Sequence, residues 1–416
     1  MHGNDIASAA TEPAPSDLEI VSVDDHVLEP PDLWQRYLPS RFQDAAPRVV
    51  QERGRYAPGK INVWEQTDDG EWASIWRFED YEMTINPGFA AAGHDQNTLG
   101  DNWVAMTYDG IREGCFEQKP RLADMDLAGI QASLCFPTFP RFCGQTFLQN
   151  GARDLSLACV QAYNDWMIDE WCDGDGHGRL IPLTLIPLWD AELAAAEIRR
   201  CADKGSHAMA FSENPTRLKL PSIHSGYWDP LFTACAETDT VVNMHIGSSS
   251  TFPFTSIDAP RAAILALTYQ GSSHAFADWM TSGVLQRYPT LRVALSEGQV
   301  GWMPYLLERL DQVWNERPRY GNLNGLLERA PSEYMRDQMY GCVFDDVAGL
   351  KLRDEIGMTQ IMFETDYPHG DSTWPRCREV LDKLVHGAGL SDHERYLLAR
   401  GNAIRCYGLE RFGITA

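Results

Sequence analysis

The spacing of apolar residues changes along this chain. From about residue 129 onward, short and nearly continuous apolar runs recur, and each is followed by a stretch with helical spacing. An earlier run of the same kind covers residues 18–23. Short unbroken apolar runs are typical of strands that are buried on both faces, as in parallel sheets. The predicted strands are 18–23, 129–137, 180–186, 208–211, 241–245, 291–298, a short run near 342–344, and 360–366.

Eight strands that alternate with helices predict an α/β fold, and a (β/α)8 TIM barrel rather than an open sheet. Asp190 is expected to cap an Ala-rich helix that ends at Lys204-Gly205. Further helices are expected near 160–170 and over 394–407. In such a fold the chemistry lies where the strands end, at their carboxyl tips.

Residues 29–121 break this alternation. The stretch holds many aromatic residues and loop formers, and it lies between the first and second predicted strands. We predict an insertion that acts as a lid over the barrel mouth or as an oligomer arm, with a plain surface elaboration as the alternative. The predicted organisation is a flexible leader (1–17), the barrel (18–410) with its insertion, and a C-terminal tail (411–416).

The charge and composition of the chain limit the classes of molecule that it is expected to bind. The 35 basic and 59 acidic residues give a net charge of −24, which argues against nucleic acid and anionic membranes as partners. A small-molecule substrate is expected instead. The sequence holds no apolar run near the roughly 20 residues that span a bilayer, and its first 17 residues lack an apolar signal core, so a cytoplasmic enzyme is expected. The ten cysteines are scattered without a Cys-x-x-Cys pair, which predicts reduced, buried thiols.

Residues that bind metals follow five of the predicted strands. Each one alone has an ordinary explanation: His245 as a core histidine, Glu213 as a loop carboxylate, or Glu297 as a charge near a helix start. Together they predict a metal site at one rim of the barrel, because strand ends of a parallel barrel converge. The candidate ligands are Asp24, His26, Glu213, His245, Glu297 and Asp366, with His369 as a possible seventh.

Several longer motifs support a family resemblance. The chain resembles the amidohydrolase-related ("amidohydrolase 2") family of the amidohydrolase superfamily over about residues 18–410. The residues that carry the resemblance are Asp24-Asp25-His26-Val27-Leu28-Glu29-Pro30-Pro31-Asp32-Leu33-Trp34, His245, Ser282-Gly283-Val284, Arg287-Tyr288-Pro289, Ser296-Glu297-Gly298, Trp302 and Thr365-Asp366. Motifs for dinucleotide-binding, P-loop or serine-hydrolase chemistry do not occur.

This resemblance implies a distorted TIM barrel with one or two metal ions. By position, Asp24 replaces the usual first His, His26, His245 and Asp366 match, Glu213 falls where a bridging group stands, and Glu297 replaces a His as ligand or acid/base. The carboxylate-rich set suits Fe or Mn at least as well as Zn. We expect two divalent ions, iron first with Mn or Zn as alternatives, bridged by Glu213 or Asp366, because a lone ion would leave buried carboxylates uncompensated.

The resemblance leaves two kinds of enzyme open. The motif subgroup is similar to nonheme diiron (or Fe/Mn) monooxygenases that hydroxylate small carboxylic, amino-acid or acyl substrates, and this is the favoured prediction. The alternative is a metal-dependent hydrolase or decarboxylase of a small organic acid, as in other branches. The predicted catalytic residues are Glu297, Asp366 and His274, and a homo- or hetero-oligomer is expected. A barrel with a degraded site, acting only as a partner subunit, is the third possibility.

Overall fold

The computed structural model describes residues 20–57, 63–94, 104–256, 258–316 and 321–415, so the predicted leader lies outside the described residues. Within them, parallel strands alternate with helices. One sheet has the order β1 (Ile20–Val27), β6 (Ile130–Pro137), β7 (Leu180–Ile181). The other has the order β12 (Ile361–Phe363), β11 (Met339–Val343), β10 (Val293–Ser296), β9 (Val241–His245), β8 (Ala208–Ser212).

Backbone contacts also join the edges of these two sheets. A parallel bridge pairs Thr184 with Met209, which links the segment after β7 to β8. At the other edge, the N–H groups of Thr365 and Asp366 donate to the carbonyl of Asp24, at 3.4 and 2.9 Å, and link the end of β12 to β1. The predicted α/β fold with parallel strands is therefore confirmed. Each predicted strand is present, and β9 has the bounds expected for it.

The third predicted strand is much shorter than expected. Regular pairing covers only Leu180–Ile181 of residues 180–186, and the next contact is the isolated bridge at Thr184. Pro182 explains the break, because a proline has no N–H to donate to a neighbouring strand.

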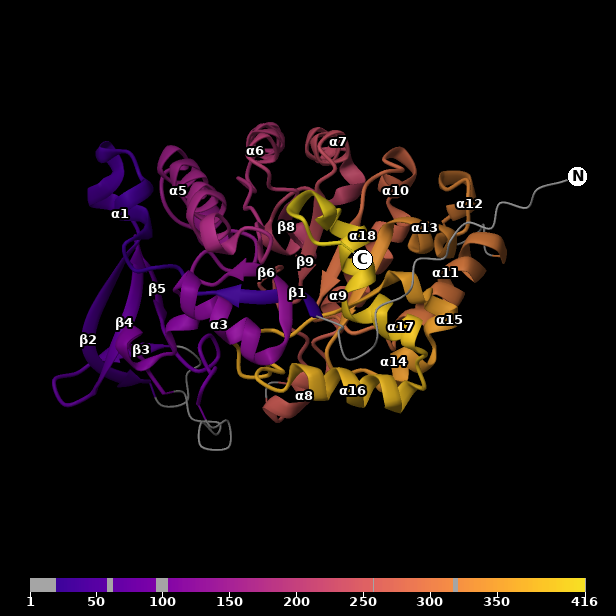
Figure 1. The fold of residues 1–416 in the computed structure, drawn as a ribbon. Coiled ribbons are helices and arrows are strands. Elements are labelled where there is room, and N and C mark those ends of the chain that lie inside the picture. Colours follow the sequence, from indigo (N-terminus) through magenta and orange to yellow (C-terminus); the bar gives the residue numbers. More distant parts are fainter. Residues whose placement is uncertain (1–19, 58–62, 95–103, 257, 317–320, 416) are drawn as a thin grey trace, which may run out of the picture.

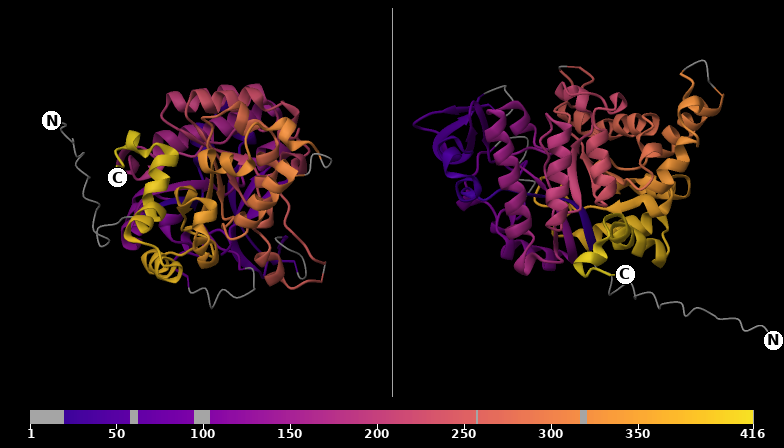
Figure 2. Two further views of the ribbon diagram at one scale, coloured as in Figure 1. Left: turned by 90° about the vertical axis from the view of Figure 1, so that its right-hand side faces the viewer. Right: turned by 90° about the horizontal axis from the view of Figure 1, so that it is seen from above.

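Helices surround the strands and cover their outer sides (Figures 1 and 2). The Asp190 side chain accepts hydrogen bonds from the N–H groups of Glu192 and Leu193, so it caps the predicted Ala-rich helix. The predicted helix near 160–170 ends in a π-helical turn at Met167–Trp171, and the one over 394–407 is interrupted by a π-helical turn at Leu397–Gly401. The main helices are α3 (Gln118–Ala128), α5 (Arg153–Trp166), α6 (Ala191–Asp203), α7 (Asp229–Glu237), α9 (Gln270–Thr281), α11 (Met303–Glu316), α13 (Pro331–Gln338), α16 (Cys377–Ala388), α17 (Asp392–Tyr396) and α18 (Asn402–Tyr407).

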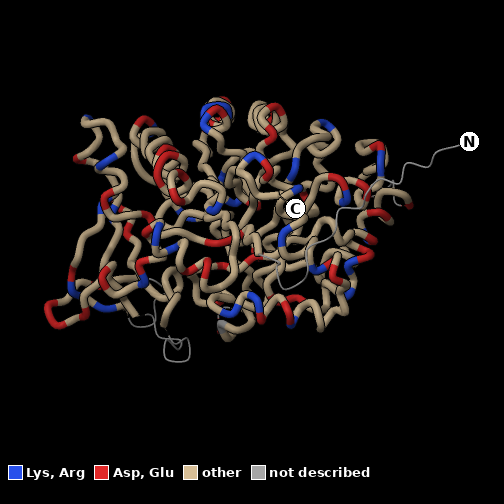
Figure 3. The backbone as a smooth tube through the Cα atoms, in the orientation of Figure 1, with Lys and Arg blue, Asp and Glu red and all other residues tan. Residues whose placement is uncertain are grey.

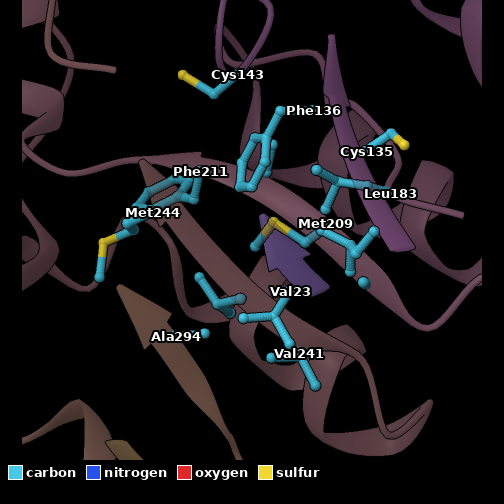
Figure 4. Packing of buried hydrophobic residues seen from close by; sticks show 14 of the residues in the cluster. Val23, Cys135, Phe136, Cys143, Leu183, Met209, Phe211, Val241, Met244 and Ala294 are labelled. Atoms are coloured by element: carbon cyan, nitrogen blue, oxygen red, sulfur yellow. The ribbon is translucent and has the colours of Figure 1, made fainter. Parts of the chain in front are cut away.

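The core packs strand side chains against one another. Figure 4 shows Val23 of β1, Phe136 of β6, Met209 of β8 and Val241 of β9 gathered in one cluster, and all four are buried. All ten cysteines are buried and unpaired, which confirms the prediction of buried thiols. Acidic residues are spread along the outer helices with Lys and Arg between them (Figure 3). In the described part of the chain, every helix is too short or too polar to cross a membrane.

The stretch between β1 and β6 forms a small antiparallel sheet beside the parallel strands, at the left of Figure 1. Its strands have the order β3 (Trp64–Gln66), β2 (Arg48–Tyr56), β4 (Glu71–Phe78), β5 (Tyr81–Thr84). Trp34 and Trp76 from this stretch are fully buried against Phe139, whereas Trp72 is 56% exposed. The segment after β5 reaches the strand ends, because the N–H groups of Ala91 and Ala92 donate to the Pro368 carbonyl. Its role as a lid or oligomer arm stays a prediction.

Candidate metal site

Three strand ends bring two imidazoles and two carboxylates together. Asp24 and His26 alternate along β1, and alternate residues of a strand point to the same side. His245 ends β9, and Asp366 follows β12. His26 Nε2 lies 3.1 Å from His245 Nε2 and 3.5 Å from Asp366 Oδ1. Asp24 lies between the two imidazoles, with Oδ1 3.7 Å from His26 Nε2 and Oδ2 3.5 Å from His245 Nε2.

The two imidazoles point their Nε2 atoms at each other. His245 Nδ1 lies 2.6 Å from the Ile246 carbonyl, so Nδ1 carries the proton and Nε2 has a free lone pair. The Pro137 carbonyl hydrogen-bonds the His26 ring, and because Nε2 faces His245, Nδ1 is the donor. Burial, followed by the neighbouring His369 and His245, lowers the pKa of His26 well below its usual value. Burial opposes a charge on His245, but Glu297 outweighs it and raises the pKa of His245. Without an ion, a proton on one Nε2 joins the two rings; a divalent cation between the two Nε2 atoms would replace that proton.

The carboxylates of Asp24 and Asp366 have few partners. All four oxygen atoms are buried, none accepts a well-aligned hydrogen bond from the described residues, and the nearest polar contact is His369 Nδ1, 2.9 Å from Asp366 Oδ1. Burial raises the pKa of Asp24 well above its usual range, and Glu364 and Glu297 raise it further. Burial, then Glu297 and Asp371, does the same to the pKa of Asp366. A buried polar group without a partner costs about 1–3 kcal/mol, and a charged one costs more. A divalent cation removes this cost, so the residues present fit a metal ion.

Unusual backbone geometry marks the same site. Glu297 and Asp366 have φ angles of 56° and 54°, in the left-handed region that non-glycine residues seldom adopt. Each such residue costs on the order of 1–3 kcal/mol. Specific hydrogen bonds hold both: the Glu297 N–H donates to Glu364 Oε2 at 3.1 Å, and the Asp366 N–H donates to the Asp24 carbonyl. Such strain is concentrated at functional sites.

Glu297 and His369 form an outer pair on the same cluster. Glu297 Oε1 lies 3.3 Å from His245 Nε2, and His369 Nδ1 lies 2.9 Å from Asp366 Oδ1. The His369 ring stacks on His26 with centroids 3.7 Å apart. The side chains of Glu297 and His369 are 11% and 12% exposed, whereas those of Asp24, His26, His245 and Asp366 are at most 2% exposed. The outer pair is therefore the part of the cluster that a substrate can reach.

The outer pair is in its deprotonated form near neutral pH. Burial alone favours the neutral form of Glu297, but the His245 charge outweighs it and lowers the pKa of Glu297 to about 2. Burial lowers the pKa of His369 to about 4. With His26 and Asp366, this pair makes a second ligand group that overlaps the Asp24–His26–His245 group. Phe142 stacks on His245 at 4.2 Å and adds an aromatic surface.

Two predicted site residues lie apart from these groups. Glu213 Oε1 accepts hydrogen bonds from Gly247 N (3.0 Å), Ser249 N (3.3 Å) and Ser249 Oγ (2.7 Å), so this carboxylate supports the loop after His245. His274 lies exposed on α9, in mid-helix. Among the described residues, neither belongs to a ligand group. The reason is local: the loop after His245 occupies one oxygen of Glu213, Oε1, while Oε2 is buried without a hydrogen bond, and the helix presents His274 to solvent.

Sequence reasoning missed two buried acids beside the ligands. Asp25 is 1% exposed and lies between Asp24 and His26 on β1, while Glu364 is fully buried and accepts the Glu297 N–H. A signal for Glu364 existed, because it lies in the strand predicted over 360–366, whereas Asp25 lies two residues past the end of the strand predicted over 18–23. Period-2 alternation points Asp25 away from its two neighbours, so it was not expected to share their ion.

Comparison with known proteins identifies the relatives of this chain. Residues 76–409 match the family model described as amidohydrolase. A gamma-resorcylate decarboxylase from Polaromonas sp. is 25% identical over 244 residues, which cover 54% of this chain and 69% of that protein.

Two solved structures resemble the fold over most of their length. An amidohydrolase from Mycobacterium avium subsp. paratuberculosis has a TM-score of 0.68 and 20% identity, covering 94% of this chain and 99% of its own. A 5-carboxyvanillate decarboxylase from Novosphingobium aromaticivorans, solved with manganese and 4-hydroxy-3-methoxy-5-nitrobenzoic acid, has a TM-score of 0.62 and 18% identity, covering 94% and 96%. At this identity the likeness shows the fold alone.

Proposed function

The chain belongs to the amidohydrolase family, and on this basis we propose that it is a metal-dependent enzyme that decarboxylates a small organic acid. The amidohydrolase relatives imply a TIM barrel, and the parallel strands with linked edges support the closed (β/α)8 form for this chain. In that form the ligand-bearing strand ends surround one mouth.

One observation supports the metal site most: the Nε2 atoms of His26 and His245 lie 3.1 Å apart, next to the buried carboxylates of Asp24 and Asp366, whose closest polar neighbours are imidazoles. This arrangement is costly for a protein without a cation and favourable for one that holds a divalent ion. We therefore assign Asp24, His26, His245 and Asp366 as the ligands. Two imidazoles and two carboxylates suit Mn, Fe or Zn.

Glu297 and His369 are proposed to act on the substrate. When bound, the ion supplies positive charge that attracts an anionic substrate oxygen and stabilises negative charge. Decarboxylation breaks the carbon–carboxyl bond, releases CO₂ and puts a proton on the carbon that lost it. Glu297 and His369 are the accessible members of the cluster and are deprotonated near neutral pH, so one of them would first take up a proton from the substrate or from solvent and then deliver it to the carbon. Phe142 offers an apolar surface to the rest of the substrate.

The relatives favour decarboxylation over the monooxygenase expected from the sequence. Gamma-resorcylate, 2,6-dihydroxybenzoate and 5-carboxyvanillate decarboxylases all occur among them, and manganese is bound in two of the decarboxylase structures. The expectation of iron and of oxygen chemistry finds no support in these comparisons. The decarboxylase alternative, with a single ion, agrees better with the deep set of ligands.

The oxygenase stays a second candidate because of the overlapping ligand groups. His26 and Asp366 belong to the outer group with Glu297 and His369, and His26 also belongs to the inner group, so the geometry offers ligands for two neighbouring ions. A dinuclear carboxylate-rich site of this kind suits redox metals. Glu213 takes no part in either group and is not proposed as a bridge.

Metal content and gas exchange distinguish the candidates. The purified chain is reconstituted anaerobically with Mn²⁺, Fe²⁺ or Zn²⁺, metal per chain is measured by mass spectrometry, and a panel of hydroxybenzoates is assayed for CO₂ release and O₂ uptake. The decarboxylase proposal predicts about one ion per chain and metal-dependent CO₂ release without O₂ uptake. Two ions with O₂ uptake and a hydroxylated product would favour the oxygenase instead. A chain that binds no metal would overturn both.

A further inference from the structure

Asp25 is a buried carboxylate that, unlike its neighbours, has all the hydrogen bonds it needs. Its Oδ1 accepts from Ser22 Oγ at 3.1 Å, from Thr365 Oγ1 at 2.5 Å and from the Tyr367 N–H at 2.9 Å. Its Oδ2 accepts a short hydrogen bond from Ser133 Oγ. Four donors therefore surround the carboxylate of Asp25, and it belongs to neither ligand group, although Asp24 and His26 on either side of it are proposed ligands.

These bonds join the three chain segments that meet at the site. Ser22 and Asp25 lie on β1, Ser133 lies on β6, and Thr365 and Tyr367 flank the ligand Asp366. Thr365 Oγ1 and its N–H also contact Ser22 Oγ, at 3.1 and 3.0 Å. The Asp25 carboxylate thus fixes the backbone that carries Asp24 and His26 relative to the backbone that carries Asp366.

Arg121 reinforces the same junction. Its guanidinium lies 4.3 Å from the centroid of the Tyr367 ring, and it donates to the His26 carbonyl and to the Gly114 carbonyl. Arg121 is 1% exposed, so its positive charge is buried beside the negative charge of Asp25. The cation ties α3 to the ligand strand, and the pair holds Tyr367 between them.

We propose that Asp25 is a positioning residue of the metal site: its carboxylate aligns Asp24 and His26 with Asp366 and thereby sets the affinity for the divalent ion. This inference rests on the metal site of the proposed function. Partners of metal ligands that hold them in orientation typically change metal affinity by about 10- to 100-fold when they are altered. Here Asp25 orients the ligands through the backbone segments that carry them.

The matched test compares Asp25→Asn with Glu197→Gln. Glu197 on α6 is also buried, at 3% exposure, and accepts from Arg200 Nη2 at 2.7 Å and Asn164 Nδ2 at 2.7 Å, with no proposed ligand among its partners. Both changes keep side-chain size and remove a buried charge, so both are expected to lower the melting temperature. Mn²⁺ affinity is measured by calorimetry below the melting range of each variant, and the Mn²⁺ electron paramagnetic resonance spectrum is recorded.

We expect Asp25→Asn to weaken Mn²⁺ binding by about tenfold or more and to change the spectrum, while Glu197→Gln leaves both as in the wild type. Ser133→Ala removes one donor to Asp25 and keeps the charge, so it should give a smaller loss of affinity, and it serves if Asp25→Asn fails to fold. Wild-type affinity and spectrum in Asp25→Asn, or in Ser133→Ala where only that variant folds, would overturn the inference and leave the proposed function intact. A wild-type chain without Mn²⁺ binding would instead overturn the proposed function.

Discussion

Two sets of buried carboxylates lie close together at the strand ends, and they differ in their hydrogen bonds. Asp24 and Asp366 accept no well-aligned hydrogen bond from the described residues, whereas Asp25 and Glu213 accept several from backbone and hydroxyl groups. Both sets are buried carboxylates, and in the second set only Oε2 of Glu213 lacks a hydrogen bond. A buried carboxylate needs a cation or hydrogen-bond donors to offset the cost of its burial. We infer that the first set binds a cation, and that the second set holds the backbone in place through its hydrogen bonds.

The largest effect is expected from neutralising a carboxylate of the first set. Asp366→Asn should abolish metal binding and lower activity by about a thousandfold, because a bound ion contributes several kcal/mol to catalysis. The metal-free variant should also be more stable than the metal-free wild type by about 1–3 kcal/mol, since an uncompensated charge is removed. Chemical denaturation in the presence of a chelator measures this. A less stable variant would show that Asp366 has a protein partner in place of an ion.

Glu29 is an intermediate case, since it is fully buried and accepts N–H groups from Thr138 and Phe139, yet burial raises its pKa to about 7. Folding therefore favours its protonated form. Its contribution to stability is complete below pH 4.5, the ordinary value of its pKa, and is lost as pH rises to about 7. We expect a loss of up to about 3 kcal/mol in the free energy of unfolding over this range.

Glu29→Gln removes this titration, so the difference between wild type and variant should change across that pH range. Urea denaturation at a series of pH values measures it. Parallel pH profiles for the two proteins would mean that Glu29 ionises at an ordinary pH.

Removing the ion should destabilise the wild type but not Asp366→Asn. A ligand at about 100 times its dissociation constant stabilises the folded state by about 2.7 kcal/mol. We expect Mn²⁺ to raise the melting temperature of the wild type, EDTA to reverse the rise, and neither to affect the variant. An equal Mn²⁺ effect on both proteins would place the stabilising ion elsewhere.

The smallest effect on metal content is expected from substitutions in the second set of carboxylates. Glu213→Gln should keep full metal content, because its Oε1 already serves Gly247 and Ser249, and it should lower stability by about 1–3 kcal/mol through the disturbed loop. Metal analysis and thermal unfolding test both parts. Loss of an ion from this variant would restore the bridging role that the sequence suggested for Glu213.

The sequence predicted the strands well, because they depend on short-range pattern, and the role of the strand-end residues as metal ligands stays a prediction. Apolar runs located β9 to the residue, and the position of His245 and Asp366 at strand ends brought them to one cluster. The sequence pattern did not predict the roles of residues that depend on contacts with distant parts of the chain. Glu213 has the position of a ligand, but the amides of a loop 34–36 residues later occupy it. The role of Asp25 depends on Ser133 and Thr365, which are 108 and 340 residues away.

Anomalous scattering from crystals soaked in Mn²⁺ tests the central claim most directly. The account predicts an anomalous peak between His26 Nε2 and His245 Nε2, in contact with Asp24 and Asp366, and no peak at Glu213. The peak should vanish in crystals of Asp366→Asn. A second peak at Glu297 and His369 would favour the dinuclear candidate. The absence of any peak between the two imidazoles at saturating Mn²⁺ would contradict the assignment of this cluster as a metal site.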